Sequence, residues 1–146
     1  NAEKLKLARQ LGAEVVNTRD GDPVKAVKDL TGGRGADVVI EAVGSEETVD
    51  MAVEMAAVGG RVVLVGLMAV GKRAPLHVAR VVRSGISIVG SYGARPRVDL
   101  PRVISMVDKG LLKPELLAGP YYRLEDINSA VEALRSGKAI RPIILV

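Results

Sequence analysis

The sequence of 146 residues has no cysteine, one histidine and only three aromatic residues, all of them tyrosine. The absence of cysteine excludes a disulfide framework, a thiol nucleophile and a thiolate metal site. With His77 as the single histidine, no metal centre of histidine and cysteine ligands can be assembled from these residues. We interpret His77 as a surface residue and not as a catalytic one. The core must be built from Val, Leu, Ile, Ala and Met.

The sequence also lacks an apolar run of membrane-spanning length and a signal-peptide pattern at its start. We therefore expect a cytoplasmic protein with no membrane partner. Asn and Gln are rare, which together with the absence of cysteine points to a thermophilic source.

Positive charge is in excess, with a net charge of +4. The basic residues group at Lys72-Arg73, Arg80–Arg83 and Arg95–Arg97, with Arg102 nearby. No aromatic stacking platform and no helix-turn-helix pattern accompanies them, so we interpret these groups as solvated surface and expect no nucleic-acid partner.

A Gly-rich phosphate loop of the form G-x-G-x-x-G between a strand and a helix is missing as well. The run Gly32-Gly33-Arg34-Gly35 precedes a strand and not a helix. It therefore predicts a turn and not a phosphate cradle.

Two apolar, β-branched runs bounded by glycine are present at 37–42 and 61–67. Such runs are typical of strands that are buried on both faces of a parallel sheet. A helical pattern over 46–57 separates them, which gives the βαβ rhythm of an α/β fold. Ligands of such sheets bind beyond the carboxyl ends of the strands, so we expect a site where these two strands end.

The rest of the chain shows further helix and strand patterns with recognisable start and stop signals. In chain order these are a helix over 4–11 that ends before Gly12, a strand over 14–17, a helix from Asp22-Pro23 to Leu30, a helix from Pro75 to Gly85, a strand over 86–92, a helix from Asp99 to Lys109, an irregular or extended segment over 114–122, a helix over 124–135 and a strand over 142–146.

Four stretches, in this order and spacing, resemble the C-terminal part of a zinc-type alcohol dehydrogenase of the medium-chain dehydrogenase/reductase family. They are Glu3–Ala13, Gly32–Gly44, Gly59–Gly66 and Leu134–Arg141. Each motif alone is weak, and none of them indicates a substrate.

The resemblance implies a partial doubly wound, Rossmann-type and mostly parallel sheet that lacks its first two strands, followed by a C-terminal helix and strand. Residues 1–92 are then part of a dinucleotide-binding domain, and residues 93–146 are a segment that returns to the catalytic domain. The family's Gly-rich loop, and the catalytic domain with its zinc ligands, are expected to precede Asn1. Zinc is therefore expected only in that missing domain.

The resemblance also implies which residues bind the cofactor, NAD or NADP. Lys4 matches a position that reaches the adenosine ribose, and Arg141 matches an Arg that contacts the pyrophosphate. The strand ends that match the cofactor-binding edge are Ala42, Val43, Gly44, Val65, Gly66, Leu67, Ser91 and Tyr92. Tyr92 departs from the aliphatic residue expected there. Three alternatives stay open: Lys4 as an exposed helix lysine, Arg141 as cover for a strand edge, and residues 42–44 as mere packing.

The function hypothesis is the nucleotide-binding portion of an NAD(P)-dependent alcohol dehydrogenase-like oxidoreductase, which transfers a hydride between an alcohol and a nicotinamide. We assign no catalytic and no metal-binding residue, and we expect the isolated chain to be inactive. The alternative is a non-catalytic structural or oligomerisation fragment that binds no nucleotide. The strand 86–92 is expected at the sheet edge without Pro or Lys inside it, which favours a homodimer through this strand.

Overall fold

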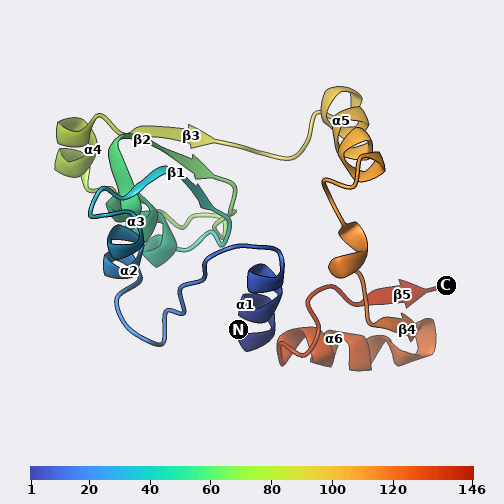
Figure 1. The fold of residues 1–146 in the computed structure, drawn as a ribbon. Helices are drawn as coiled ribbons and strands as arrows, with labels where there is room; N and C mark the ends of the chain where they lie inside the picture. The colour runs from blue at the N-terminus through green and yellow to red at the C-terminus, as the bar shows by residue number, and fades with distance from the viewer. The chain divides into compact units, whose positions relative to one another are not determined.

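The computed structural model describes all 146 residues. The chain forms two compact units, one of residues 16–93 and one of residues 1–15 together with 94–146 (Figure 1). None of its helices combines the length and the apolar character needed to cross a membrane.

The unit of residues 16–93 is a three-stranded sheet with three helices (Figure 1). Its strands lie in the order β1-β2-β3, and both pairs are parallel. The elements are α2 (Pro23–Leu30), β1 (Ala36–Glu41), α3 (Glu46–Met55), β2 (Ala56–Leu64), α4 (Val78–Ser84) and β3 (Ser87–Gly90). The α/β fold class, the parallel sheet and the βαβ rhythm expected from the sequence are confirmed.

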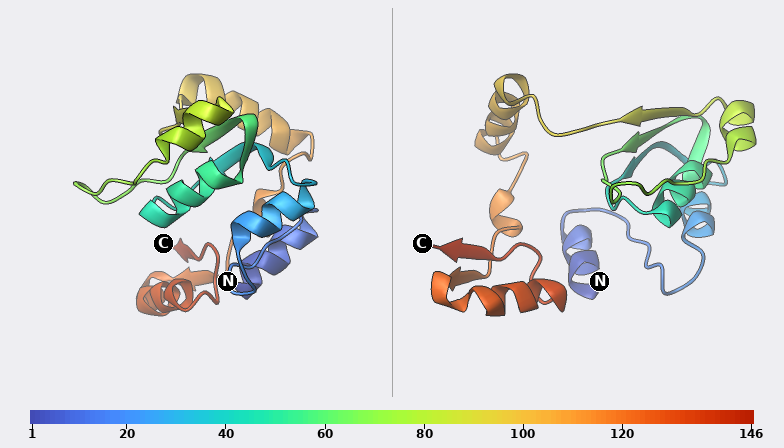
Figure 2. Two further views of the ribbon diagram at one scale, coloured as in Figure 1. Left: turned by 90° about the vertical axis from the view of Figure 1, so that its left-hand side faces the viewer. Right: turned by 180° about the vertical axis from the view of Figure 1, so that it is seen from behind.

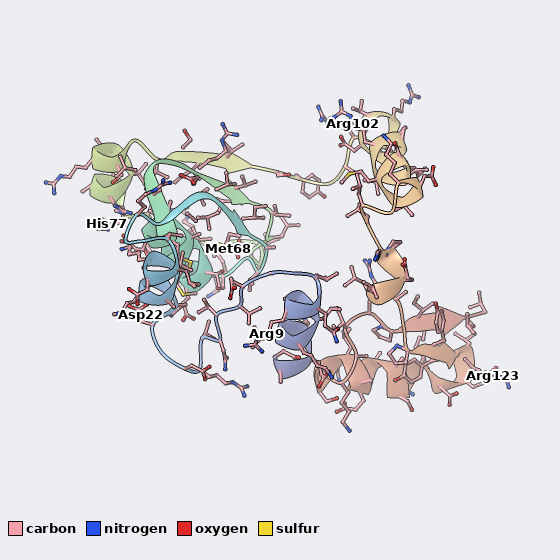
Figure 3. The ribbon with its side chains drawn as sticks, in the orientation of Figure 1. Arg9, Asp22, Met68, His77, Arg102 and Arg123 are labelled. Carbon is pink, nitrogen blue, oxygen red and sulfur yellow. The ribbon has the colours of Figure 1, made fainter.

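Local signals in the sequence fix the helix ends of this unit. Asp22 caps α2, because its carboxylate accepts hydrogen bonds from the backbone N–H of Val24 at 2.8 Å and of Lys25 at 3.3 Å. Pro23 occupies the first turn, and Figure 3 labels Asp22 at this end of α2. Gly85 ends α4 with a φ of 59°, in the left-handed region that glycine adopts without strain.

One face of the sheet carries the core of the unit. Its buried residues come from α3, β2 and the residue before β3, and they are Ala52, Val53, Ala56, Val62 and Ile86. Val39, Leu64, Val81 and Ile88 pack around them, so α3 and α4 cover the same face (Figure 2). On the opposite face Val38, Ile40 and Val89 are exposed. A parallel sheet is normally covered on both faces, so this open face fits the expected partial Rossmann-type sheet.

Several element boundaries in this unit differ from the sequence-based prediction, and the helix predicted over 46–57 ends at Met55. The strand predicted over 61–67 begins earlier, because Ala56 pairs with Ala36 ahead of a shift in register. The helix predicted from Pro75 begins only at Val78. The strand predicted over 86–92 is shorter, since its pairing with β2 runs from Ser87 to Gly90.

The interpretation of Arg80 as solvated surface is wrong. Its guanidinium Nη2 donates to the carbonyl oxygen of Ala56 at 2.7 Å, and its Nη1 donates to Ser84 Oγ at 3.0 Å. Ala56 is the C-cap residue of α3 and is fully buried. Arg80 therefore satisfies a buried carbonyl at the end of that helix. Arg102, in contrast, projects outward from α5 (Pro96–Asp108) in Figure 3.

The second unit contains α1 (Ala2–Gln10) and the elements that follow residue 93. These later elements are α5, the 3₁₀ turn η1 (Pro114–Leu116), β4 (Tyr121–Arg123), the 3₁₀ turn η2 (Leu124–Asp126), α6 (Ile127–Arg135) and β5 (Ile143–Leu145). β4 and β5 form a parallel two-stranded sheet against which α6 packs. Two of the expected elements, the last helix and the last strand, are confirmed.

Other predictions in this part of the sequence need correction. Residues 14–17 form no strand, because no other strand pairs with them. Asp99, predicted as a helix start, lies inside the first turn of α5, where its carboxylate accepts from the backbone N–H of Arg95 at 2.8 Å. The segment 114–122, predicted as irregular or extended, begins with the 3₁₀ turn η1 and ends in the extended strand β4.

Candidate functional site at the carboxyl edge of the sheet

The ends of β1 and β2 touch each other through glycine backbone. A Cβ atom on Gly66 would lie 2.2 Å from the Gly44 nitrogen, and one on Gly44 would lie 2.5 Å from the Leu67 carbonyl oxygen. Gly44 also has a φ of 79°, which side chains rarely tolerate. The predicted residues 42–44 and 65–67 are thus brought together, and both glycines are needed for this approach. The sequence placed both glycines at the cofactor-binding edge, but it did not indicate that they contact each other.

A buried carboxylate lies beneath this contact. Glu41 is the last residue of β1 and is only 4% exposed. Its Oε1 atom accepts three hydrogen bonds, from the backbone N–H of Val43 at 2.7 Å, the backbone N–H of Gly44 at 2.8 Å and the Thr48 hydroxyl at 2.8 Å. The sequence analysis missed Glu41. The available signal was an acidic residue in the same alternation as Val39, which is half-buried against the core.

The hydrogen bonds decide the charge of Glu41. Burial raises the pKa of its carboxyl, but the backbone N–H of Gly44, the Thr48 hydroxyl and the backbone N–H of Val43 together lower the pKa below its ordinary value. The side chain is therefore an anion at neutral pH. Its second oxygen, Oε2, is buried without a hydrogen-bond partner, and a Cβ on Gly66 would lie 2.7 Å from it.

The third strand ends at the same edge. The backbone N–H of Ser91 donates to the Leu64 carbonyl oxygen at 2.9 Å, which continues the pairing of β3 with β2. Large apolar side chains at these strand ends are open to solvent: Val43 is 71% exposed, Leu67 is 72% and Tyr92 is 85%. The edge therefore offers an apolar ledge that flat rings can cover.

A cleft of about 340 Å³ lies beside Gly66 on the face that α3 covers. Its walls are apolar side chains of α3, β2, β3 and the segment 68–76, with Met68 labelled in Figure 3. The two charged residues in the lining, Lys72 and Arg73, form no ion pair. Positive charge without an acidic partner favours an anionic group at this cleft.

Two predicted cofactor residues, Lys4 and Arg141, belong to the other unit. Lys4 is exposed on α1, where its backbone N–H donates to the Asn1 side chain at 3.1 Å. Arg141 is also exposed, and its carbonyl oxygen accepts from the backbone N–H of Gly119 at 2.9 Å. Neither side chain forms an ion pair.

The residues of the chain do not fit a zinc centre. No group of three or more His, Cys, Asp or Glu side chains is placed to hold a metal ion.

The family model described as zinc-binding dehydrogenase matches residues 1–109. The NAD-dependent alcohol dehydrogenase of Sulfurisphaera tokodaii is 30% identical over 99% of this chain and 40% of its own length. The sorbitol dehydrogenase of Halalkalibacterium halodurans is 27% identical, over 97% of the chain and 41% of its own length. Among solved structures, benzyl alcohol dehydrogenase from Acinetobacter calcoaceticus is similar with a TM-score of 0.91 and 29% identity, over 99% of this chain and 40% of that one. The chain thus spans about 40% of the length of these relatives.

Proposed function

Because this chain belongs to the zinc-binding dehydrogenase family, we propose that it is the nucleotide-binding portion of an NAD(P)-dependent alcohol dehydrogenase-like oxidoreductase. The observation that carries the proposal is the carboxyl edge of the sheet, where the ends of β1, β2 and β3 lie together. Parallel α/β sheets bind their ligands at this edge. The name of the relative from Sulfurisphaera tokodaii supports NAD as the dinucleotide.

The chemistry of the edge suits a dinucleotide. The apolar ledge of Val43, Leu67 and Tyr92 can pack against the adenine, the nicotinamide and their riboses. We assign Arg141 to the pyrophosphate, because its unpaired guanidinium offers a rigid fork of donors to phosphate oxygens. We assign Lys4 to the adenosine ribose.

In the proposed reaction the dinucleotide supplies the carbon that accepts or donates a hydride. The residues of this chain bind and orient it, and none of them supplies a catalytic acid, a catalytic base or a zinc ligand. We therefore propose that the chain by itself forms no NAD(P)H from an alcohol, and that the chemistry needs residues outside it.

Titration with NADH tests the proposal. Binding is followed by the change in the fluorescence of NADH itself. We expect saturable binding in the full-length protein. We also expect Arg141→Ala to weaken it by about 1.5–3 kcal/mol, because a hydrogen bond between charged groups is lost. That is about 10- to 100-fold in Kd.

Arg135→Ala is the matched control, since Arg135 is an exposed arginine of α6 without an ion pair. It should leave the Kd unchanged, and Arg141→Ala should leave the melting temperature close to that of the wild type. If Arg141→Ala lowers the melting temperature but keeps the affinity, Arg141 only covers a strand edge. The absence of any NADH binding by the full-length protein would refute the proposed function and favour a structural module.

We also propose that the protein forms a homodimer through β3. This strand is paired on one side only, by β2, and its sequence contains neither Pro nor Lys. An edge of this kind is a template for pairing with a second chain.

A further inference from the structure

We propose that Glu41 is a positioning residue for the dinucleotide, a role that rests on the proposed function. Its side chain and its carbonyl group together hold the strand ends 42–44 and 65–67 in the conformation that receives the cofactor. Because Glu41 is 4% exposed, it acts through these strand ends and not by direct contact.

The side chain of Glu41 fixes the end of β1. A single oxygen, Oε1, accepts from the backbone N–H groups of Val43 and Gly44 and from the Thr48 hydroxyl. Thr48 is tied in turn to the start of α3, because its backbone N–H donates to Ser45 Oγ at 3.1 Å and its hydroxyl oxygen accepts from the Ser45 backbone N–H at 3.2 Å. The carboxylate thus connects the turn after β1 to the first turn of the next helix.

The carbonyl group of the same residue fixes the end of β2. The carbonyl oxygen of Glu41 accepts from the backbone N–H of Val65 at 2.8 Å and of Gly66 at 3.0 Å. A Cβ atom on Gly66 would lie 2.2 Å from the Gly44 nitrogen and 2.7 Å from the unpaired Oε2 atom, so only a glycine fits between the turn and the carboxylate. One residue therefore holds both strand ends, one with its side chain and the other with its main chain.

The role of the Glu41 side chain at the end of β1 explains why a charged acceptor occupies this position. Hydrogen bonds from N–H groups to a carboxylate are shorter and stronger than those to a neutral oxygen. They hold the Gly44 turn in its left-handed conformation, and a displacement of about 1 Å at a binding or reacting position can cost about 100-fold in function.

Amide hydrogen exchange without any cofactor tests the holding role in the full-length protein. In Glu41→Ala the N–H groups of Val43 and Gly44 lose their acceptor, and we expect their exchange to accelerate at least about tenfold. The N–H groups of Val65 and Gly66 keep theirs, because the main-chain carbonyl remains, and they serve as the internal control. Glu41→Gln retains the reach and one oxygen acceptor but not the charge, so it should restore part of the protection. If Glu41→Ala does not fold, Glu41→Gln and the shorter Glu41→Asp replace it. We then expect the loss of protection at the N–H groups of Val43 and Gly44 in Glu41→Asp.

NADH titration of the same variants tests the positioning role. We expect the Kd to rise about tenfold or more in Glu41→Ala or Glu41→Asp, and to rise less in Glu41→Gln. Unchanged exchange at Val43 and Gly44, or an equal acceleration at Val65 and Gly66, would overturn the holding role. Accelerated exchange with an unchanged Kd would overturn the positioning role. A wild-type protein that does not bind NADH would instead refute the proposed function, and the exchange result would still decide whether Glu41 holds the turn.

Discussion

At the scale of single residues, the candidate edge depends on two glycines that serve different purposes. Gly44 needs both a left-handed backbone and space, because Leu67 lies against the position of its missing Cβ. Gly66 has an ordinary φ and needs space alone. A side chain at either position would push the two strand ends apart.

Gly44→Ala should therefore lower the free energy of unfolding by about 3–4 kcal/mol, from backbone strain and from the clash with Leu67. Gly59→Ala is the matched control, since Gly59 has a similar φ of 72° but nothing within 4 Å of the added Cβ. It should cost only about 1 kcal/mol. Urea unfolding measures the loss in the free energy of unfolding for both variants. Equal losses would mean that the clash with Leu67 adds nothing to the strain of the left-handed backbone.

The lowered pKa of Glu41 makes the unit of residues 16–93 sensitive to acid. In the unfolded chain Glu41 has its ordinary pKa of 4.5, so below that pH the unfolded state binds more protons than the folded state. The stability that ionised Glu41 contributes is thus fully present above pH 4.5 and is lost as the pH falls through the lower pKa of the folded state.

We expect the free-energy difference between the wild type and Glu41→Gln to be constant near neutral pH and to shrink below pH 4.5. Unfolding by urea at several pH values measures this difference, in which the titration of all other groups cancels. A difference that stays constant down to pH 3, or that begins to shrink at neutral pH, would contradict the lowered pKa.

The sequence placed the site residues 42–44 and 65–67 correctly at strand ends, because a βαβ pattern reveals where parallel strands stop. It did not reveal Glu41. An acidic residue at the end of an apolar strand looks like a solvated one until the register shows that it shares a face with Val39 and Val62. For the same reason Arg80 was taken for solvated surface, although it reaches a carbonyl group 24 residues away in sequence.

At the scale of elements, α3 has both of its ends satisfied by side chains. Ser45 and Thr48 form a capping box at the N-terminus, and Arg80 of α4 reaches the carbonyl of Ala56 at the C-terminus. This helix covers the core face of the sheet, so its two ends link the turn after β1 to α4.

Arg80→Met should remove the second of these links while keeping most of the apolar stem. We expect the free energy of unfolding to fall by about 1–3 kcal/mol, because the buried carbonyl of Ala56 is left without this donor. Arg83→Met, on the same helix at an exposed position, should be within about 0.5 kcal/mol of the wild type. Similar losses in both variants would indicate a general effect of charge removal from α4 and not a loss of the cap.

Helices were predicted more accurately than strands, for a physical reason. Asp22, Pro23 and Gly85 are start and stop signals that act within one turn of chain. A strand exists only with a partner, which explains why the predicted strand 14–17 is absent and why β2 gains residues from Ala56 onward. The sequence of β4 gave no sign of its partner β5, about 20 residues later.

At the scale of the whole molecule, the proposed dimer leads to a prediction about β3. Ile86 is buried and Ile88 packs on the core, so a charge at either position would disturb folding as well as association. Val89 is exposed on this edge strand and is the better position. A lysine within an edge strand is a common protection against pairing.

Val89→Lys should therefore convert a dimer into a monomer that still folds. Light scattering at micromolar concentration measures the mass. Val70→Lys, at a fully exposed loop position, is the control and should leave the dimer intact. A wild-type monomer, or a dimer that tolerates Val89→Lys, would show that β3 is not the interface.

The scarcity of aromatic residues leaves a single intrinsic fluorophore in the unit of residues 16–93. Tyr121 and Tyr122 belong to the other unit, so Tyr92 alone reports on this one, from a position just past the end of β3. With Tyr121 and Tyr122 replaced by phenylalanine, the ultraviolet emission of these 146 residues would come from one side chain that stands at the proposed cofactor edge. Events at that edge could then be followed in real time without an attached dye.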